Sequence, residues 1–313
     1  MDRKLTIGTR ASPLALAQTE IVRAALAAAH DWPLGHLQTK KIVTRGDKNL
    51  SVPLAEIGGK GLFTEELDEG LRAGEIDFAV HSLKDLPTQD APGLVTAAIM
   101  ARAPSADILV INPHIRASGL DDLPVNARIG TSSLRRKAQL LHRRPDFDIV
   151  PLRGNVGTRL KKLEDENLAA TLLAEAGLHR LALTPPNKVV LSPDIILPAA
   201  AQGALAIQCR SDDTYMRAAL RPLHCAQTAA CVAGERALLA GLDGSCRTPI
   251  AALAEIDGDE ISLQARLLAE NGADMCAVVG RCAIDETNAA QLGARLAQDI
   301  KNQAPHLLPK GSA

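Results

Sequence analysis

The sequence contains few aromatic residues: one Trp, one Tyr and three Phe, or 2% of the chain. Proteins that bind single-stranded nucleic acid stack bases on aromatic side chains, so this scarcity argues against that class. No stretch approaches the roughly 18 uncharged apolar residues that a membrane-spanning helix requires. The first residues, MDRKLTIGTR, lack the apolar core of a signal peptide. We therefore expect a cytoplasmic protein without nucleic-acid or membrane partners.

The cysteines lack the spacing of a metal site. All six lie in the last third of the chain, and none forms a C-x-x-C pair. In a reducing compartment they are thiols by default, and no metal is expected. With 46% hydrophobic and 23% charged residues, the 313-residue chain has the composition of a soluble globular protein. Its length favours two or three domains.

Strand-like runs alternate with helical patterns up to about residue 210, which indicates α/β domains with largely parallel sheets. Helices are predicted from Ser12 to about His30 and from Thr64 to Gly74, with Ser12 and Thr64 as N-caps. The chain passes from the first lobe to the second and back, so we predict a hinge with a cleft between two lobes. The predicted first domain covers residues 1–104 and 199–220, and the second covers 105–198.

From residue 221 to 313 the pattern changes to a small α+β domain. A helix leads into three strands separated by turns at Asp257-Gly258 and Asn271-Gly272, which predicts a three-stranded antiparallel sheet. A final helix is expected from Thr287 to about Gln303. The two lobes share one short echo, Ile-Gly-Thr at residues 7–9 and 129–131. If the echo is more than chance, the lobes carry equivalent strand-to-helix turns.

A basic segment predicts anionic ligands. Between Arg128 and Lys162 basic residues far outnumber the two acidic residues, Asp146 and Asp148. Ser132 and Ser133 are N-cap candidates that place Arg135 and Arg136 in the first helical turn, where the helix dipole disfavours cations by about 0.3–1 kcal/mol each. A bound carboxylate or phosphate would offset that penalty. The alternative is a solvated surface, or pairing with the two aspartates, and the two readings are about even.

Other cations recur at equivalent places. Arg10 precedes the helix start at Ser12, and the Arg153-Gly154-Asn155 turn is followed by Arg159. In α/β sheets, ligands bind at such carboxyl ends of strands. Several arginines there suggest a small ligand with several carboxylates.

Three further segments have both a structural and a functional interpretation. Lys84-Asp85 follows an apolar strand and is either a simple turn or an acid that stabilises positive charge and moves protons. The segment IGGKGLF, residues 57–63, is either a glycine turn or a lid containing Lys60 and Phe63. Cys246 lies in DGSCRTPI, where small neighbours leave it uncrowded and an arginine favours the thiolate, so it could be a nucleophile, a redox sensor or an attachment point. The other five cysteines are expected to be small buried hydrophobic residues.

Together these segments resemble the porphobilinogen deaminase family. The segments that carry the resemblance occur in the family's order over nearly the whole chain: IGTRASPLALAQ, IGGKGLFTEEL, AVHSLKDLPT, IGTSSLRRKAQL, LRGNVGTRL, AGLHRL, LPAAAQGALAIQCR and GSCRTPI. The resemblance implies an enzyme, a transferase, that joins four porphobilinogen molecules into hydroxymethylbilane in tetrapyrrole (porphyrin and heme) biosynthesis. It also implies a monomer with two periplasmic-binding-protein-like lobes and a third domain.

The resemblance also implies the roles of individual residues. Asp85 matches the catalytic aspartate, and Cys246 matches the cysteine that carries a dipyrromethane cofactor by a thioether. The implied cofactor-binding residues are Lys84, Ser133, Arg135, Arg136 and Asn155, and the implied substrate-binding residues are Arg10, Ser12, Arg153, Arg159 and Arg180. The sequence departs from the family pattern at several places, including residues 103–107, APSAD, where Asp-Pro-Arg-Asp is usual. None of these departures removes a residue assigned to catalysis.

Two rival functions remain at this point. A non-catalytic, two-lobed anion-binding protein would share the lobes and the arginines but would not need Asp85 or Cys246. A thiol hydrolase would need His81 or His224 within hydrogen-bond reach of the Cys246 sulfur.

Overall fold

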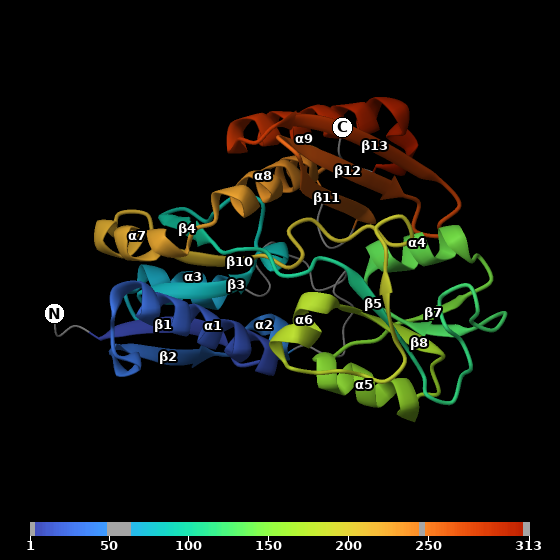
Figure 1. Cartoon of the computed structure of the whole chain (residues 1–313), viewed down its shortest axis with the longest axis horizontal. Helices are drawn as coiled ribbons and strands as arrows, with labels where there is room; N and C mark the ends of the chain where they lie inside the picture. Colours follow the sequence, from blue (N-terminus) through green and yellow to red (C-terminus); the bar gives the residue numbers. More distant parts are fainter. Residues whose placement is uncertain (1–3, 49–63, 244–247, 309–313) are drawn as a thin grey trace. The chain divides into compact units, whose positions relative to one another are not determined.

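Two five-stranded sheets of related topology organise most of the chain (Figure 1). The computed structural model describes residues 4–48, 64–243 and 248–308. The first sheet has the order β2-β1-β3-β10-β4. Its strands are β1 (Leu5–Arg10), β2 (Leu37–Ile42), β3 (Phe78–Ser82), β4 (Leu94–Ile99) and β10 (Leu205–Arg210). Strand β10 runs antiparallel to both of its neighbours, so the predicted parallel character holds for the other four strands.

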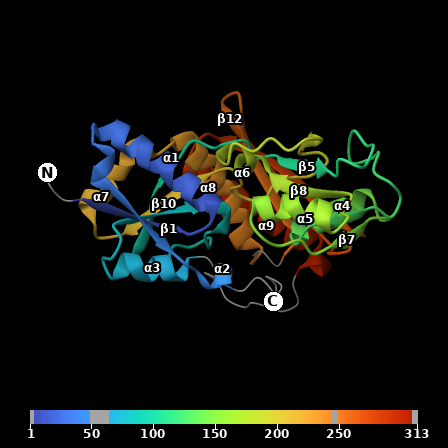
Figure 2. The same ribbon diagram turned by 90° about the horizontal axis from the view of Figure 1, so that it is seen from below.

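Helices cover both faces of this sheet (Figure 2). Val22 and Leu26 of α1 (Pro13–His30) pack with Phe78 on one face. Leu67 of α3 (Glu65–Arg72) packs with Ala79 on the other face, because successive strand residues point to opposite sides. The remaining helical segments of this part are η1 (Leu34–His36), α2 (Arg45–Lys48), η2 (Leu83–Asp85), α7 (Thr214–Leu220) and η3 (Arg221–Leu223).

The second five-stranded sheet repeats the pattern with the order β7-β6-β8-β5-β9. Its strands are β5 (Asp107–Ile111), β6 (Arg128–Gly130), β7 (Asp148–Val150), β8 (Ala170–Ala174) and β9 (Lys188–Leu191). Its helices are α4 (Leu134–Arg143), α5 (Val156–Asp165) and α6 (Glu175–Arg180). Strand β5 is antiparallel to both of its neighbours, as β10 is in the first sheet.

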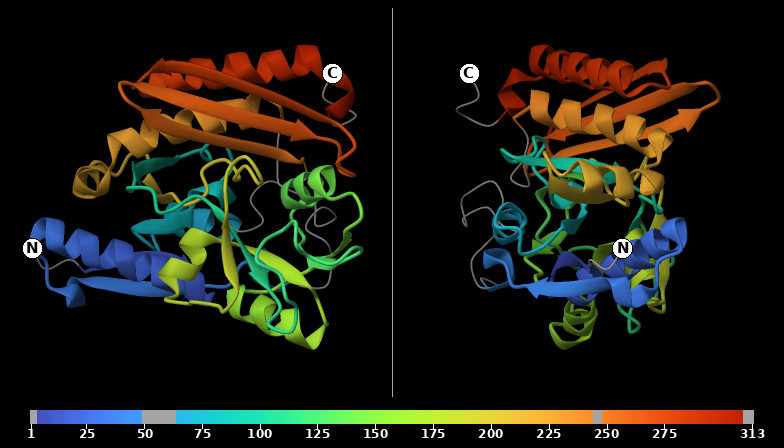
Figure 3. Two further views of the ribbon diagram at one scale, coloured as in Figure 1. Left: turned by 45° about the vertical axis from the view of Figure 1, so that its right-hand side comes forward. Right: turned by 90° about the vertical axis from the view of Figure 1, so that its left-hand side faces the viewer.

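A third sheet, antiparallel with the order β11-β12-β13, follows near the end of the chain. Its strands are β11 (Ile250–Asp257), β12 (Glu260–Leu268) and β13 (Met275–Ala283), and its helices are α8 (Ala226–Gly241), α9 (Glu286–Gln303) and η4 (Pro305–Leu307). Helix α9 lies along one face (Figure 3). The buried residues of β12, such as Leu263 and Leu267, pack with α8 and α9 on that face. The predicted mixed α/β fold with a three-stranded antiparallel sheet is confirmed.

By contacts, the described residues form two compact units. The first comprises residues 4–48, 64–103 and 203–229, and the second comprises residues 104–202, 230–243 and 248–308. The chain therefore crosses from the first unit to the second, returns to the first with β10, and crosses to the second again after residue 229. The separation of a third domain from the second stays a prediction. No described helix is both long and apolar enough to traverse a membrane.

A few local predictions were confirmed only in part. Thr64 occupies the N-cap position of α3, but its side chain makes no capping hydrogen bond. Cys209, Cys231 and Cys276 are buried as predicted, whereas Cys225 and Cys282 are only partly buried. Burial raises the pKa of the Cys209 thiol to about 11, which keeps it protonated.

Candidate functional site

The turn after β1 forms the first part of the site. The hydroxyl oxygen of Ser12 accepts a hydrogen bond from the Ala15 backbone N–H at 3.3 Å, and Pro13 begins α1. The Thr9 hydroxyl donates to the Ala15 carbonyl oxygen at 3.2 Å and ties the strand to the helix. Because the Ser12 oxygen accepts the capping bond, its O–H remains available to donate. The N-cap predicted from Ser12-Pro13 is confirmed.

The turn after β3 forms the second part. The Gln18 side-chain amide donates to the Ser82 hydroxyl oxygen at 2.8 Å, which joins α1 to the end of β3. The Leu83 N–H donates to the Ala204 carbonyl oxygen at 3.0 Å and fixes η2 against the start of β10. Asp85 ends η2 with an exposed side chain, and no hydrogen bond or ion pair joins that carboxylate to another described residue. Lys84 beside it is half-buried.

These turns meet at a small cavity in the first unit, at the carboxyl ends of β1 and β3, which is where ligands bind in α/β sheets. The structure thus brings together Arg10, Ser12 and Asp85, which the sequence analysis had singled out separately. The residues that line the cavity are Arg10, Ser12, Leu14, Ala15, Gln18, Thr64, Val80, His81, Ser82 and Asp85. Cation, hydroxyl and carboxylate around one cavity can hold a small acid and also act on a developing positive charge.

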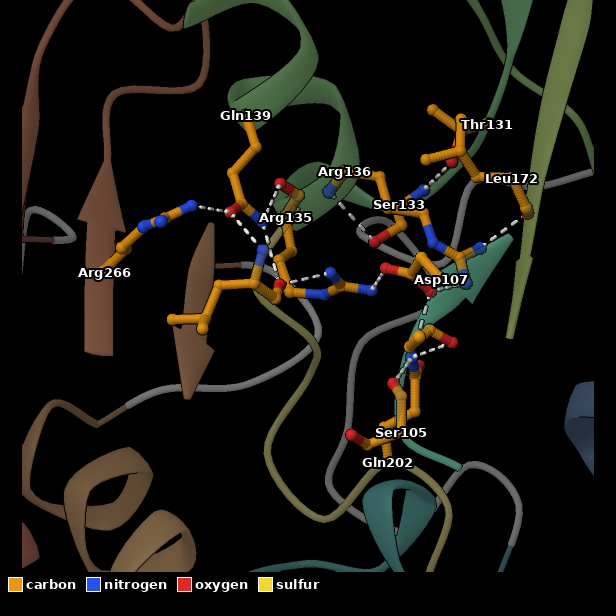
Figure 4. A network of polar contacts seen from close by, with 12 residues as sticks. Ser105, Asp107, Thr131, Ser133, Arg135, Arg136, Gln139, Leu172, Gln202 and Arg266 are labelled. Carbon is orange, nitrogen blue, oxygen red and sulfur yellow. Dashed lines mark hydrogen bonds and ion pairs between the residues drawn. The ribbon is translucent and has the colours of Figure 1, made fainter. Parts of the chain in front are cut away.

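The start of α4, in the second unit, holds a buried ionic network (Figure 4). Ser133 is the N-cap and accepts from the Arg136 N–H at 3.4 Å, as the sequence predicted. Guanidinium nitrogens of Arg135 and Arg136 lie 2.8 and 2.6 Å from the two carboxylate oxygens of Asp107. Gln202 donates to the same carboxylate at 3.0 Å. Asp107 is fully buried and each arginine is 6% exposed, so the network lies almost entirely out of water.

The charges of the network are set by its geometry. Burial alone would raise the pKa of Asp107, but Arg135 and Arg136 outweigh it and hold the pKa of that carboxyl far below its usual range. Two guanidiniums share one carboxylate, which leaves a net positive charge. The anion that the sequence predicted beside these arginines is therefore supplied in part by the chain itself. The alternative partners were wrong, because Asp146 pairs with Arg144 at 2.7 Å and Asp148 with Arg128 at 3.6 Å.

The same network reaches the segment between β9 and β10. Arg135 donates to the Leu197 carbonyl oxygen at 2.7 Å, and Gln139 bonds both the N–H and the carbonyl of Leu197, at 2.8 and 3.0 Å. Arg266 of β12 donates to the Gln139 side-chain oxygen at 3.1 Å. Helix α4, this segment and the three-stranded sheet are thus tied together within the second unit.

The turn before α5 gathers three more predicted residues. Asn155 caps the helix, accepting from the Thr158 N–H at 2.8 Å, and Arg159 donates to the Gly154 carbonyl at 2.9 Å. Gly154 has φ of 119°, and a Cβ there would come within 2.7 Å of Thr158, so glycine is required. Arg153 is half-buried in the same turn. At the end of α6, burial lowers the pKa of Arg180 to about 10, where it remains charged at neutral pH.

Some predicted residues cannot be placed. Cys246, Lys60 and Phe63 lie outside the described residues, so their roles stay predictions. In the part of the chain that the structure describes, no group of three or more His, Cys, Asp or Glu has the arrangement of a metal site. Asp107 was not predicted from the sequence, and His81 was named only for a rival function. A charged residue at the head of the apolar run DILVI was the available signal for Asp107.

Among solved structures, the chain resembles bacterial substrate-binding proteins. A substrate-binding domain of a putative amino acid ABC transporter from Streptococcus pneumoniae covers 70% of this chain and 90% of that one, with 11% identity and a TM-score of 0.44. A periplasmic binding protein from Brucella ovis with glutathione bound covers 77% and 69%, with 14% identity and a TM-score of 0.42. Similarity at this level carries no argument about function.

Sequence matches are far stronger. Residues 5–218 match the family model "Porphobilinogen deaminase, dipyromethane cofactor binding domain", and residues 229–302 match "Porphobilinogen deaminase, C-terminal domain". The porphobilinogen deaminase of Paracoccus denitrificans is 45% identical over 303 residues, 96% of this chain and 95% of its own length. That of Sphingopyxis alaskensis is 47% identical, over 94% and 93% of the two chains. The chain belongs to the porphobilinogen deaminase family.

Proposed function

We propose that this chain joins four porphobilinogen molecules head to tail, with loss of ammonia, to form hydroxymethylbilane in tetrapyrrole biosynthesis. Membership of the porphobilinogen deaminase family supports this activity. The structural observation that carries it is the placement of Asp85, an exposed carboxylate in the same cavity as Arg10 and Ser12. Such a cavity can bind an acidic pyrrole through Arg10 and Ser12 and brings the Asp85 carboxylate to act on its reacting carbon.

Asp85 serves the charge and proton changes of the reaction. The bond between the aminomethyl carbon and nitrogen breaks, ammonia leaves with the bonding pair, and positive charge spreads over the pyrrole ring. A fixed carboxylate stabilises that cation and orients the leaving amine. After the new carbon–carbon bond forms, a proton must leave the ring carbon, and the same carboxylate can assist its removal.

The arginines bind the carboxylates of the substrate. Each porphobilinogen carries one acetate and one propionate side chain, which guanidinium groups hold by paired hydrogen bonds. In the first unit Arg10 and the free O–H of Ser12 supply donors at the cavity. In the second unit the proposed substrate-binding residues are Arg153, Arg159 and Arg180.

The start of α4 fits the dipyrromethane cofactor. Nε of Arg136 is buried and lacks a hydrogen-bond partner within the described residues, and the network around it carries net positive charge. Ser133 and the helix N-terminus add donors suited to the cofactor's carboxylates. We propose that Ser133, Arg135, Arg136, Asn155 and Lys84 hold this group, with Cys246 as its covalent anchor. When bound, the cofactor supplies the pyrrole carbon to which the first substrate is joined.

Further proposals concern the state of the protein. We place it in the cytoplasm as a monomer, without nucleic-acid or membrane partners. We also retain the three-domain division, with 1–104 and 199–220 as the first domain, 105–198 as the second and 221–313 as the third, and a lid containing Lys60 and Phe63. The solution mass of the purified chain tests the monomer.

Intact mass spectrometry tests the function. The unsubstituted chain should carry a two-pyrrole increment that Cys246→Ser removes, and added porphobilinogen should produce further one-pyrrole steps. An unmodified mass without steps, together with no consumption of porphobilinogen, would contradict the proposal. Binding of porphobilinogen without consumption would instead favour the rival, a non-catalytic anion-binding protein.

A further inference from the structure

His81 is a buried ionisable residue that the mechanism above does not use. It lies at the end of β3 and is 6% exposed. Its Nε2 atom is buried and has no hydrogen-bond partner among the described residues. A buried polar atom without a partner costs about 1–3 kcal/mol, and proteins keep few of them. Such an atom beside a cavity calls for an explanation.

The position of His81 places it within the candidate site. Ser82, the next residue, faces α1, since its hydroxyl accepts from Gln18 at 2.8 Å. His81 therefore lies on the opposite face of the sheet, the face that α3 covers. It lines the same cavity as Arg10, Ser12 and Asp85.

The surroundings keep this imidazole neutral. Burial and the nearby positive charge of Arg10 lower the pKa of His81 to about 4, against a smaller opposite effect of Asp90. Asp85, on the turn that follows β3, is the other charged group at the cavity. A neutral imidazole has one N–H donor and one acceptor, and it adds no second cation beside Arg10.

We propose that His81 binds substrate: its Nε2–H donates to the pyrrole carboxylate that Arg10 and Ser12 hold at the cavity. The inference rests on the proposed function and names a residue for which neither the resemblance nor the mechanism gave a role. A carboxylate has about four lone-pair positions, so a guanidinium, a hydroxyl and an imidazole N–H can be accepted together. The ligand would supply the partner that the folded chain lacks.

Binding measured without turnover tests the role. In an Asp85→Ala background, in which consumption of substrate should be strongly slowed, the Kd of porphobilinogen is measured by calorimetry with and without His81→Leu. A hydrogen bond to a charged group contributes about 1.5–3 kcal/mol, so Kd should rise about 10- to 150-fold. The melting temperature of ligand-free His81→Leu should stay equal or rise, because leucine removes the unpartnered polar atom.

A matched control is available in the same unit. Nε2 of His36 is also buried and without a partner among the described residues, but His36 does not line the cavity. His36→Leu should leave Kd unchanged. His81→Ala, which also removes the N–H donor, should weaken binding by a similar factor and replaces His81→Leu if the leucine variant fails to fold.

The outcomes separate this inference from the proposed function. If the unsubstituted chain consumes porphobilinogen but His81→Leu, or in its place His81→Ala, binds it with unchanged Kd, only the role of His81 is overturned. If the unsubstituted chain neither binds nor consumes porphobilinogen, the function and the inference both fail. Equal weakening by His36→Leu would also overturn it, since the effect would then not come from the cavity.

Discussion

The turns after β1 and β6 occupy equivalent places in the two five-stranded sheets. Gly8 pairs with Ala79 of β3, and Gly130 pairs with Thr171 of β8, at the same point of the Ile-Gly-Thr echo. A Cβ on Gly8 would lie 2.2 Å from Ile76, and a Cβ on Gly130 would lie 2.7 Å from a leucine side chain, so a larger residue at either place would require these side chains to shift. The echo in the sequence therefore marks a structural equivalence.

The side chains that follow the two turns differ in kind. Counting from the caps Ser12 and Ser133, the first helical turn carries an apolar pair in α1 and an arginine pair in α4. The strand register extends the match to β10 and β5. Equivalent residues, first unit before second, are Leu14 and Arg135, Ala15 and Arg136, and Leu205 and Asp107. Equivalent positions of the two sheets and helices thus carry apolar residues in the first unit and a buried ionic network in the second.

The comparison teaches where each unit places its unsatisfied groups. In the first unit, Asp85 and His81 line the cavity, and neither the Asp85 carboxylate nor the buried Nε2 atom of His81 has a partner among the described residues. In the second unit, Asp107 already satisfies much of the charge of the arginine pair. We infer that the first unit acts on the reacting atoms, and that the second holds carboxylates with a network that is largely assembled in advance.

Removing the Asp85 carboxylate should have the largest effect of the changes considered, and it should act on turnover. Asp85→Ala should lower kcat by about 10²–10⁴-fold, because charge stabilisation and proton transfer are both lost. The intact mass should still show the two-pyrrole increment, since Asp85 is not needed to hold it. Single-turnover consumption of porphobilinogen measures the effect. Turnover like that of the unsubstituted chain would remove Asp85 from the mechanism.

Removing the Asp107 carboxylate of the second unit should instead lower the free energy of unfolding. Asp107→Asn leaves two buried guanidiniums without their counterion, and breaking a buried ion pair costs about 3–5 kcal/mol. Urea denaturation measures the free energy of unfolding. Asp146→Asn, which breaks a more exposed pair with Arg144, is the control and should cost much less. Equal losses in the two variants would show that burial of the network adds nothing.

Because His81 is buried and neutral, we predict that the stability of the protein falls at acidic pH. Its pKa falls from 6.5 to about 4 on folding, so the unfolded chain binds more protons than the folded chain between those values. Its contribution to stability is therefore complete above pH 6.5 and is lost as the pH falls towards 4, by roughly 2–4 kcal/mol. Replacing His81 with Leu should remove that part of the pH dependence.

Denaturation of both forms between pH 7.5 and pH 4 measures the difference. Burial raises the pKa of Asp68 to about 6, with the opposite sign, but this group is present in both forms and cancels. Parallel pH curves for the two forms would show that His81 does not stay neutral on folding.

Local patterns were enough to predict much of the fold. Ser12-Pro13 and Ser133 mark helix starts because capping depends on near neighbours. The alternation of Ile261, Leu263 and Ala265 predicted β12, since one face of that strand is buried. The family, its enzyme class and its dipyrromethane cofactor were predicted from motifs along the whole chain and are confirmed by the matches.

Partners that are distant in sequence could not be predicted. Asp107 lies 29 residues before Arg136 in the chain, and no local spacing joins them. The sequence offered Asp146 and Asp148 instead because they are the nearby acidic residues. Burial of His81 likewise depends on packing between elements far apart in the chain. Motifs suggest which residues are used, whereas packing decides which of their charges are already paired.

The smallest expected effect comes from placing the first unit's apolar residues at the equivalent positions of the second unit. The triple variant Asp107→Leu, Arg135→Leu and Arg136→Ala gives the second unit the residues that the first carries at equivalent positions. Buried ionic groups can often be replaced by apolar groups of similar volume with little loss, although the cavity left where Ala replaces Arg136 reduces this compensation. We expect a free energy of unfolding within about 2 kcal/mol of the unsubstituted chain and clearly above that of Asp107→Asn. The Leu172 and Leu197 carbonyls, which lose arginine donors, account for the remaining loss.

The same variant separates stability from binding. If the network serves to hold carboxylates, the folded triple variant should lack the two-pyrrole mass increment although its stability is largely restored. A triple variant as unstable as Asp107→Asn would mean that the second unit depends on the charges themselves, and that the structural equivalence of the turns does not extend to their packing. A stable variant that retains the increment would mean that the arginine pair contributes to neither folding nor binding, and cofactor retention would have to come from other residues.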